Sequence, residues 1–273
     1  MKIIGIDLGN YCTKTSKGIS FISKVSEIPN ILVNKPIQIN DKIMYLEEGE
    51  FDTEPRKAYK KNLLYLLKGA VQMSSDDKHN KVVLGLPLSQ YKQDKEYLIN
   101  RVLQSGIVED VEVEPEGIVS LPQNFSGVVC DIGGGTTDIC LVVKEGERKR
   151  VKNPYSLPYG IHKLESEFIN QINSMYGLDL QSCDADRIIT NGLYVYGEQK
   201  PFKMDVYKEF VNNVINRIQT DYSVKTNNFI ILGGGAIKLY TAFRNRVPQC
   251  KLLTNSFYAN ANAFEMIGKE IWK

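Results

Sequence analysis

The chain has 273 residues, of which 42% are hydrophobic and 24% are charged. This composition excludes a disordered, collagenous or disulfide-stapled protein. Its 34 lysine and arginine residues stand against 32 aspartate and glutamate residues, a balance that excludes a protein whose whole surface binds nucleic acid. The length suits one large or two medium domains, so the chain can form two lobes with a cleft between them.

Five cysteines are widely spaced along the chain and show no zinc-binding spacing: Cys12, Cys130, Cys140, Cys183 and Cys250. An odd number of scattered cysteines is typical of reduced thiols. The first apolar run is too short for a signal peptide, and no stretch reaches the roughly 18 apolar residues of a membrane span. We therefore expect a soluble, cytoplasmic protein.

Strands and helices are predicted to alternate in the first half of the chain. Apolar runs at residues 2–8, 11–16 and 19–25 predict a β-meander. Apolar residues at helical spacing predict a helix over 54–68, and a strand at 81–86 and a helix at 91–104 follow. We also expect a strand at 107–113 and a short helix at 116–121.

The second half repeats this alternation. A strand at 127–131 leads into three glycines at 133–135, and a second strand follows at 137–143. Amphipathic patterns predict helices at 161–176 and 205–224. The last third is predicted to hold a strand at 228–232, three more glycines, a helix at 236–246 and a terminal helix at 259–272.

One local design occurs twice: an apolar strand ends in an aspartate, and a glycine comes two residues later. The two copies are Ile4-Gly5-Ile6-Asp7-Leu8-Gly9 and Val128-Val129-Cys130-Asp131-Ile132-Gly133. An internal repeat of this kind predicts two similar α/β lobes.

These turns have the chemistry of a phosphate site, because glycines let backbone N–H groups approach phosphate oxygens closely. A carboxylate would repel phosphate, so we expect Asp7 and Asp131 to hold Mg²⁺ through its water shell. Thr13, Thr136 and Thr137 can donate hydroxyl hydrogen bonds, and Lys14 can place a positive charge on phosphate. The sequence therefore predicts a nucleoside triphosphate site.

A structural alternative exists, because glycine-rich turns also connect ordinary hairpins. Two copies and a third cluster at 233–235 favour the nucleotide site. The chain has neither a GxxxxGK[ST] motif nor a GxGxxG that opens a helix after a first strand.

The motifs resemble those of the actin, Hsp70 and sugar kinase ATPase superfamily. Its two phosphate loops and its adenosine loop look like Ile6-Asp7-Leu8-Gly9-Asn10, Asp131-Ile132-Gly133-Gly134-Gly135-Thr136-Thr137-Asp138 and Leu232-Gly233-Gly234-Gly235-Ala236. The chain most resembles the bacterial actin-like plasmid segregation proteins, the ParM and AlfA group, through Leu84-Gly85-Leu86-Pro87, Pro115-Glu116-Gly117 and Asn260-Ala261-Asn262-Ala263-Phe264.

The resemblance implies a two-lobed α/β actin-like ATPase fold with duplicated ribonuclease H-like lobes. The first lobe would span residues 1–122 and the second 123–257, and the terminal helix at 258–273 would return to the first lobe. Because the interval between Asp131 and Gly233 is short for an actin-like protein, we expect the outer subdomain of the second lobe to be reduced or absent.

The resemblance also implies residue roles. Asp7 and Asp131 would organise Mg²⁺ and water, and Glu116 would polarise the attacking water. Glu116 can alternatively be a helix N-terminal acid that the helix dipole favours. The implied nucleotide-binding residues are Gly9, Asn10, Thr13, Lys14, Gly133, Gly134, Gly135, Thr136, Gly233, Gly234, Gly235 and Ala236.

The implied function is slow hydrolysis of ATP, with GTP as the alternative nucleotide, that controls filament assembly for plasmid segregation. The implied partners are further copies of the chain and a DNA-binding adaptor on centromere-like plasmid DNA. We expect no direct DNA or membrane binding, because the basic run near residues 144–152 is typical of a solvated hairpin tip. A non-polymerising actin-fold scaffold of the cell-division or pilus type and a small-molecule kinase of the same superfamily are the alternatives.

Overall fold

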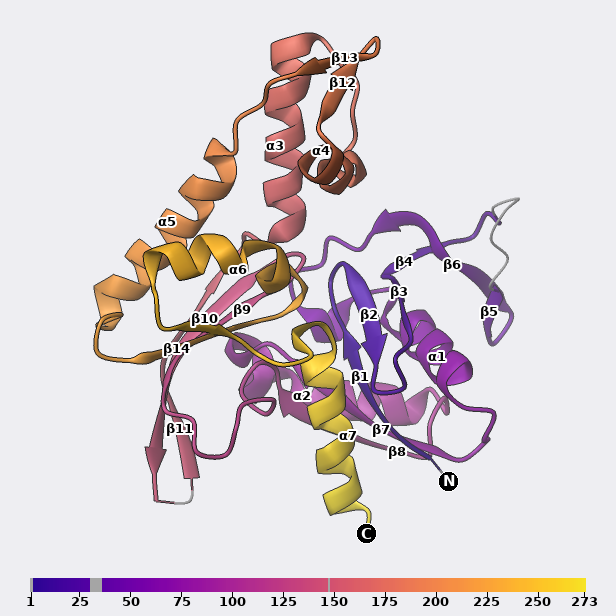
Figure 1. The fold of residues 1–273 in the computed structure, drawn as a ribbon. Helices are drawn as coiled ribbons and strands as arrows, with labels where there is room; N and C mark the ends of the chain where they lie inside the picture. Colours follow the sequence, from indigo (N-terminus) through magenta and orange to yellow (C-terminus); the bar gives the residue numbers. More distant parts are fainter. Residues whose placement is uncertain (1, 30–35, 147) are drawn as a thin grey trace.

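The computed structural model describes residues 2–29, 36–146 and 148–273. Two five-stranded sheets form two lobes (Figure 1). The first sheet has the order β3-β2-β1-β7-β8. Its strands are β1 (Lys2–Leu8), β2 (Cys12–Thr15), β3 (Ser20–Ile22), β7 (Asn80–Leu86) and β8 (Asp110–Pro115).

The second sheet repeats the first strand for strand, in the order β11-β10-β9-β14-β15. Its strands are β9 (Gly127–Ile132), β10 (Thr137–Glu145), β11 (Arg148–Leu157), β14 (Asn228–Leu232) and β15 (Cys250–Leu252). In each sheet the first three strands run antiparallel, and the last two lie parallel to the first strand of the lobe. The predicted two-lobed α/β fold is therefore confirmed.

Helices cover both sheets. Three helices pack against the first sheet: α1 (Leu63–Ser74), α2 (Leu88–Gln104) and α7 (Ala259–Ile271). The second is joined by α3 (Ile161–Tyr176), α5 (Asp205–Asp221) and α6 (Gly234–Arg246). Each lobe has a core of its own, because the buried apolar residues of the two sheets pack into separate clusters. The last helix, α7, comes back across the molecule and packs against β1 and β7.

Smaller elements extend both lobes. A three-stranded sheet of β4 (Lys24–Ser26), β6 (Lys42–Phe51) and β5 (Pro36–Ile39) belongs to the first lobe. At the far end of α3, the second lobe carries η2 (Ser182–Asp184), α4 (Ala185–Asn191) and the hairpin of β12 (Leu193–Val195) and β13 (Glu198–Lys200) (Figure 1). The outer part of the second lobe is thus small rather than absent.

One predicted helix is right only from Leu63 onward, and a second is wrong. The segment predicted as a helix at 54–68 instead forms a short turn, η1 (Lys57–Tyr59), and α1 begins only at Leu63. The Asp52 carboxylate accepts hydrogen bonds from the backbone N–H groups of Lys61 and Asn62, and this holds the intervening chain as a loop. The predicted helix at 116–121 is a series of turns, since Gly117 has a φ of +78°.

Other differences are smaller. The strand predicted at 107–113 begins at Asp110, and the run at 19–25 is divided between β3 and β4. Strands β5, β6, β11, β12, β13 and β15 were not predicted, and β11 occupies part of the run near 144–152 that was predicted as a hairpin tip. Among the described helices, none has the length and apolar character that crossing a membrane requires.

Candidate functional site

A cavity lies between the two lobes, and all three glycine clusters line it. The first turn follows β1, the second follows β9, and the third lies between β14 and α6. The first two turns pack directly on each other. A Cβ atom on Gly134 would lie 2.2 Å from the Cβ atom of Tyr11, so only glycine permits this approach. The sequence repeat therefore places its two turns face to face across one cavity.

Two lysines neutralise the first aspartate. The Lys14 Nζ atom lies 2.9 Å from Asp7 Oδ2, and the Lys57 Nζ atom lies 3.4 Å from Asp7 Oδ1. Both ammonium groups are almost wholly buried. Burial by itself raises the pKa of Asp7, but Lys14 and Lys57 together bring it below its usual value. Asp7 therefore stays ionised.

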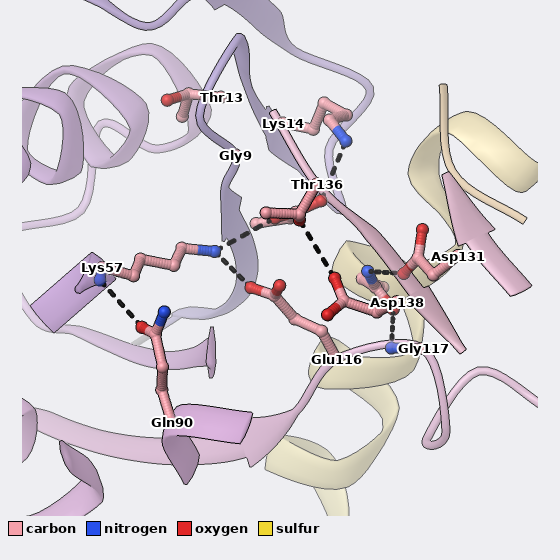
Figure 2. A network of polar contacts seen from close by, with 12 residues as sticks. Gly9, Thr13, Lys14, Lys57, Gln90, Glu116, Gly117, Asp131, Thr136 and Asp138 are labelled. Carbon is pink, nitrogen blue, oxygen red and sulfur yellow. Dashed lines mark hydrogen bonds and ion pairs between the residues drawn. The ribbon is translucent and has the colours of Figure 1, made fainter. Parts of the chain in front are cut away.

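Lys57 also forms an ion pair with Glu116 (Figure 2). Its backbone N–H donates to Gln90 Oε1 at 2.9 Å, which fixes the turn that carries it. Glu116 directly follows β8, where its backbone N–H donates to the Leu86 carbonyl at 2.9 Å. Burial raises the pKa of Glu116 against the opposing charge of Lys57. The Glu116 carboxylate therefore lines the cavity from the end of β8, in the first lobe.

The second lobe contributes two more carboxylates. Asp131 on β9 and Asp138 on β10 lie directly opposite each other in the antiparallel ladder. Burial and then the neighbouring charges of Asp138, Glu116 and Asp7 raise the pKa of Asp131 to about 7. Burial also raises the pKa of Asp138, although it accepts a hydrogen bond from Thr136 Oγ1 at 3.0 Å. The cavity therefore holds more carboxylates than its lysines can neutralise.

Asn260 joins the two lobes behind these carboxylates. It is buried near the start of α7, and its Oδ1 atom accepts a hydrogen bond from the Gly117 N–H at 2.9 Å. That bond directs its Nδ2 atom toward Asp131 Oδ2, 3.5 Å away. The side chain thus connects the turn after Glu116 with the aspartate of the second sheet.

Residues 5–123 match a family model described as the actin-like proteins N-terminal domain. The chain has an actin-like fold. Its fold is similar to that of the archaeal actin homologue Ta0583 in complex with ADP, with a TM-score of 0.79 and 18% identity over 99% of this chain and 100% of that chain. A search of curated proteins by sequence finds no match.

Two further solved structures have the same fold. A 15-stranded ParM filament from Clostridium botulinum gives a TM-score of 0.75 and 20% identity over 98% of this chain and 99% of that chain. MreB5 of Spiroplasma citri bound to AMPPNP gives 0.69 and 18% identity over 99% of this chain and 96% of that chain. These matches confirm the predicted resemblance to actin-like proteins at the level of the fold.

Most predicted site residues line the cavity. They are Asp7, Gly9, Asn10, Lys14, Glu116, Asp131, Gly133, Gly134, Gly135, Thr136, Gly233, Gly234 and Gly235. Two do not. The Thr13 hydroxyl lies 3.0 Å from that of Ser23, on the side of β2 away from the carboxylates (Figure 2), and Ala236 is fully buried in the core of the second lobe. Each lies beside cavity residues in the sequence, but its side chain faces elsewhere.

The sequence analysis missed other cavity residues. The most important is Lys57, which falls within the helix predicted at 54–68 but lies in the turn η1 before α1 begins. Asp138 could have been found, because Thr137 is buried and strand alternation then turns Asp138 toward the other face. Glu165 on α3 and Lys238 on α6 form an ion pair that also lines the cavity.

A direct metal cage is not present in the described parts of the chain, where no three His, Cys, Asp or Glu side chains converge on one point. Mg²⁺ commonly keeps several waters and takes only one or two carboxylates. Asp7 and Asp131, together with the excess of negative charge around Asp131, fit that mode of binding.

Proposed function

We propose that this chain binds ATP with Mg²⁺ between its lobes, hydrolyses it slowly and uses the nucleotide state to control assembly into filaments that segregate plasmid DNA. One observation carries the proposal. The two glycine turns face each other across one cavity, and an aspartate precedes each turn on its strand. Backbone amides of both lobes would then hold the same chain of phosphates.

The residues divide this task between them. Amides at Gly9, Asn10 and the 133–135 turn would bind phosphate oxygens, and Lys14 would add a positive charge. The third cluster, 233–235, would lie beside the adenosine. Asp7 and Asp131 would hold Mg²⁺ through its water shell, and the bound ion would neutralise charge on the phosphates.

Glu116 is the residue best placed to orient the attacking water. It lies half-buried just after β8, and Lys57 holds its carboxylate in one position. Phosphoryl transfer needs little covalent chemistry from a protein, so positioning of the water in line with the γ-phosphate is the main contribution. The raised pKa of Glu116 makes it a better proton acceptor than an exposed glutamate.

Assembly follows from the bridge between the lobes. A triphosphate held by both turns stabilises a closed shape, and loss of the γ-phosphate removes part of that bridge. Similar folds occur in an ADP complex, an AMPPNP complex and a ParM filament, which supports nucleotide-controlled self-assembly here. We propose further copies of the chain and a small DNA-binding adaptor on centromere-like plasmid DNA as its partners.

The proposal is tested by phosphate release and sedimentation, measured together over a series of protein concentrations with Mg-ATP and with Mg-GTP. We expect both signals to rise above one threshold concentration. Absence of nucleotide binding would contradict the whole proposal. Hydrolysis without a pellet at any concentration, with or without plasmid DNA and an adaptor, would favour the kinase or scaffold alternatives.

A substitution separates binding from hydrolysis. Glu116→Gln should bind ATP with the affinity of the wild type but hydrolyse it about 10²–10⁴-fold more slowly, since the water loses its acceptor. Glu114→Gln on the same strand is the matched control, because Glu114 does not line the cavity. Asp7→Ala should lose nucleotide and metal together. Hydrolysis at the normal rate in Glu116→Gln would make the assignment of Glu116 wrong.

A further inference from the structure

The loop that carries Lys57 is held by the helix beside it rather than by its own hydrogen bonds. Its only regular element, η1, is three residues long, and so short a turn has too few internal bonds to fix a side chain. Three side chains of α2 supply the missing contacts. They are Gln90, Asp94 and Arg101, which we call the polar face of α2, since their spacing places them on one side of the helix.

Two members of the polar face bind the backbone of the loop on both sides of Lys57. The Gln90 side chain accepts a hydrogen bond from the Lys57 N–H at 2.9 Å (Figure 2), and it donates one to the Pro55 carbonyl at 2.9 Å. Arg101 donates to two carbonyls in the stretch just after Lys57, at 2.6 and 2.8 Å. The backbone that carries Lys57 is therefore fixed to α2.

Asp94 is a buried charge that the cavity does not use. Its side chain is fully buried but does not line the cavity, and its two oxygens accept hydrogen bonds from Nε and Nη2 of Arg56, the residue before Lys57. The Arg56 side chain is 46% exposed, so its charge does not need this partner. A buried ion pair adds little net stability, because desolvation of the carboxylate offsets the attraction. Two parallel bonds do, however, fix the orientation of the chain beside Lys57.

Glu116 is held at the start of the same helix. Strand β7 ends at Leu86, and α2 follows directly after Pro87. The Glu116 N–H donates to the Leu86 carbonyl at 2.9 Å. Lys57 and Glu116, which form an ion pair, are thus both positioned from the junction of β7 and α2. Release of the loop from α2 would change their separation.

We propose that the polar face of α2 is a positioning element for ATP hydrolysis, which holds Lys57 against the Glu116 carboxylate. This role rests on the proposed function of Glu116 and adds the residues that support it from outside the cavity. Asp94 is a positioning residue at the centre of this face, and it acts through Arg56 and Lys57. Small displacements matter here, because a misplacement of about 1 Å in the groups that orient a reaction can cost about 10²-fold in rate.

The first test is Asp94→Asn, which keeps the size of the side chain but breaks the paired bonds to Arg56. We expect phosphate release from bound ATP to slow about tenfold to 10²-fold. The affinity for ATP should stay within about twofold of the wild type, because Asp7 keeps its ion pair with Lys14. Glu96→Gln is the matched control, an acid-to-amide change at an exposed position of the same helix, and it should match the wild type in both measurements.

A second variant covers the case in which Asp94→Asn does not fold. Arg56→Lys keeps a positive charge beside the buried carboxylate but cannot make two parallel bonds to it. This variant should fold, as measured by circular dichroism, and release phosphate about threefold or more slowly. Wild-type release in the folded variants would overturn the proposed role of the polar face.

A double variant separates positioning from a general loss of structure. The group that is positioned is absent in Glu116→Gln, so the addition of Asp94→Asn should slow phosphate release by less than about a further twofold. If the two losses multiply instead, Asp94 does not act through Glu116 and the proposal is wrong.

Hydrogen exchange of the nucleotide-free protein tests the contact without hydrolysis. The backbone N–H groups of residues 57–61 should exchange about tenfold faster in Asp94→Asn than in the wild type or in Glu96→Gln. Unchanged exchange would show that the polar face does not hold the loop. If the wild type binds ATP but does not hydrolyse it, the proposed function of Glu116 fails and positioning for hydrolysis fails with it. Normal hydrolysis in Asp94→Asn would remove the role of α2 alone.

Discussion

Lys57 is a buried lysine whose ammonium group joins Asp7 to Glu116. Removal of one member of a buried ion pair leaves the other charge without compensation. We expect Lys57→Met to lower the free energy of unfolding by about 3 kcal/mol at neutral pH, measured by urea denaturation without nucleotide. The loss should be smaller at acidic pH, where Glu116 can be protonated. Lys61→Met, at an exposed lysine of the same segment, is the control, and equal stability of the two variants would contradict this role.

Asp131 makes the stability of the nucleotide-free protein depend on pH. Its pKa is raised from 3.8 to about 7, so the folded state keeps a proton that the unfolded state loses above about pH 4. The contribution of this group is therefore greatest at low pH and is lost as the pH rises through 7. Glu116 and Asp138 act in the same direction, because burial raises their pKa values too, whereas Asp7 acts in the opposite direction.

We expect the free energy of unfolding in EDTA to fall between about pH 4 and about pH 7, the unfolded and folded pKa values of Asp131. Asp131→Asn should flatten this slope, because an amide does not titrate. Urea denaturation across the pH series measures both. A slope in Asp131→Asn as steep as in the wild type would show that another group is responsible.

The sequence predicts the place of some cavity residues and not of others. Asp7, Lys14 and Asp131 belong to a repeated local motif, so their neighbours in the sequence predict their chemistry. Lys57 reaches Glu116 from a turn 59 residues away, and no local pattern marks a lysine that will be buried. Asp138 is an intermediate case. It lies in the second motif, but only the burial of its neighbour Thr137 indicates that its side chain lies on the opposite face of β10.

Among the elements, α7 comes last in the sequence yet packs against the central strand β1. Gly5 makes this possible, because a Cβ atom there would lie 1.9 Å from the Ala261 carbonyl oxygen. We expect Gly5→Ala to push α7 outward and lower the free energy of unfolding by about 1–3 kcal/mol. Displacement of Asn260 should also weaken ATP binding. Ser20→Ala on the exposed edge strand β3 is the control for both measurements, and wild-type affinity in Gly5→Ala would separate α7 from the site.

Helices and strands were predictable where their apolar residues follow a single spacing, either helical or alternating. Helix α3 and strand β14 match their predicted bounds, because each has a single unbroken apolar pattern. The helix at 54–68 failed because Asp52 and Gln90 hold that segment through backbone hydrogen bonds from outside it. Strand β6 was missed because its buried residues, Met44 and Leu46, precede a run rich in glutamate. The boundaries at 122/123 and 257/258 stay a prediction.

At the scale of the whole molecule, three rings link the lobes beside the cavity. Phe51 at the end of β6 lies 5.3 Å from the ring of Tyr11 in the first glycine turn and 5.3 Å from the ring of His162 in α3. His162 in turn donates its backbone N–H to the Gly134 carbonyl at 3.0 Å. Phe51 therefore ties the outer sheet of the first lobe to the first glycine turn directly and to the second through His162.

We expect Phe51→Ala to speed the release of ADP about tenfold, because two aromatic contacts worth about 0.5–1.5 kcal/mol each are lost between the lobes. Release of a fluorescent ADP analogue into excess ATP, followed by stopped flow, measures the rate. Tyr97→Ala is the matched control, since Tyr97 stacks on Tyr59 at 4.3 Å within the first lobe alone. Faster release in Phe51→Ala but not in Tyr97→Ala would show that separation of the lobes limits nucleotide exchange. Equal rates in both variants and the wild type would place the limiting contact elsewhere, in the phosphate turns themselves.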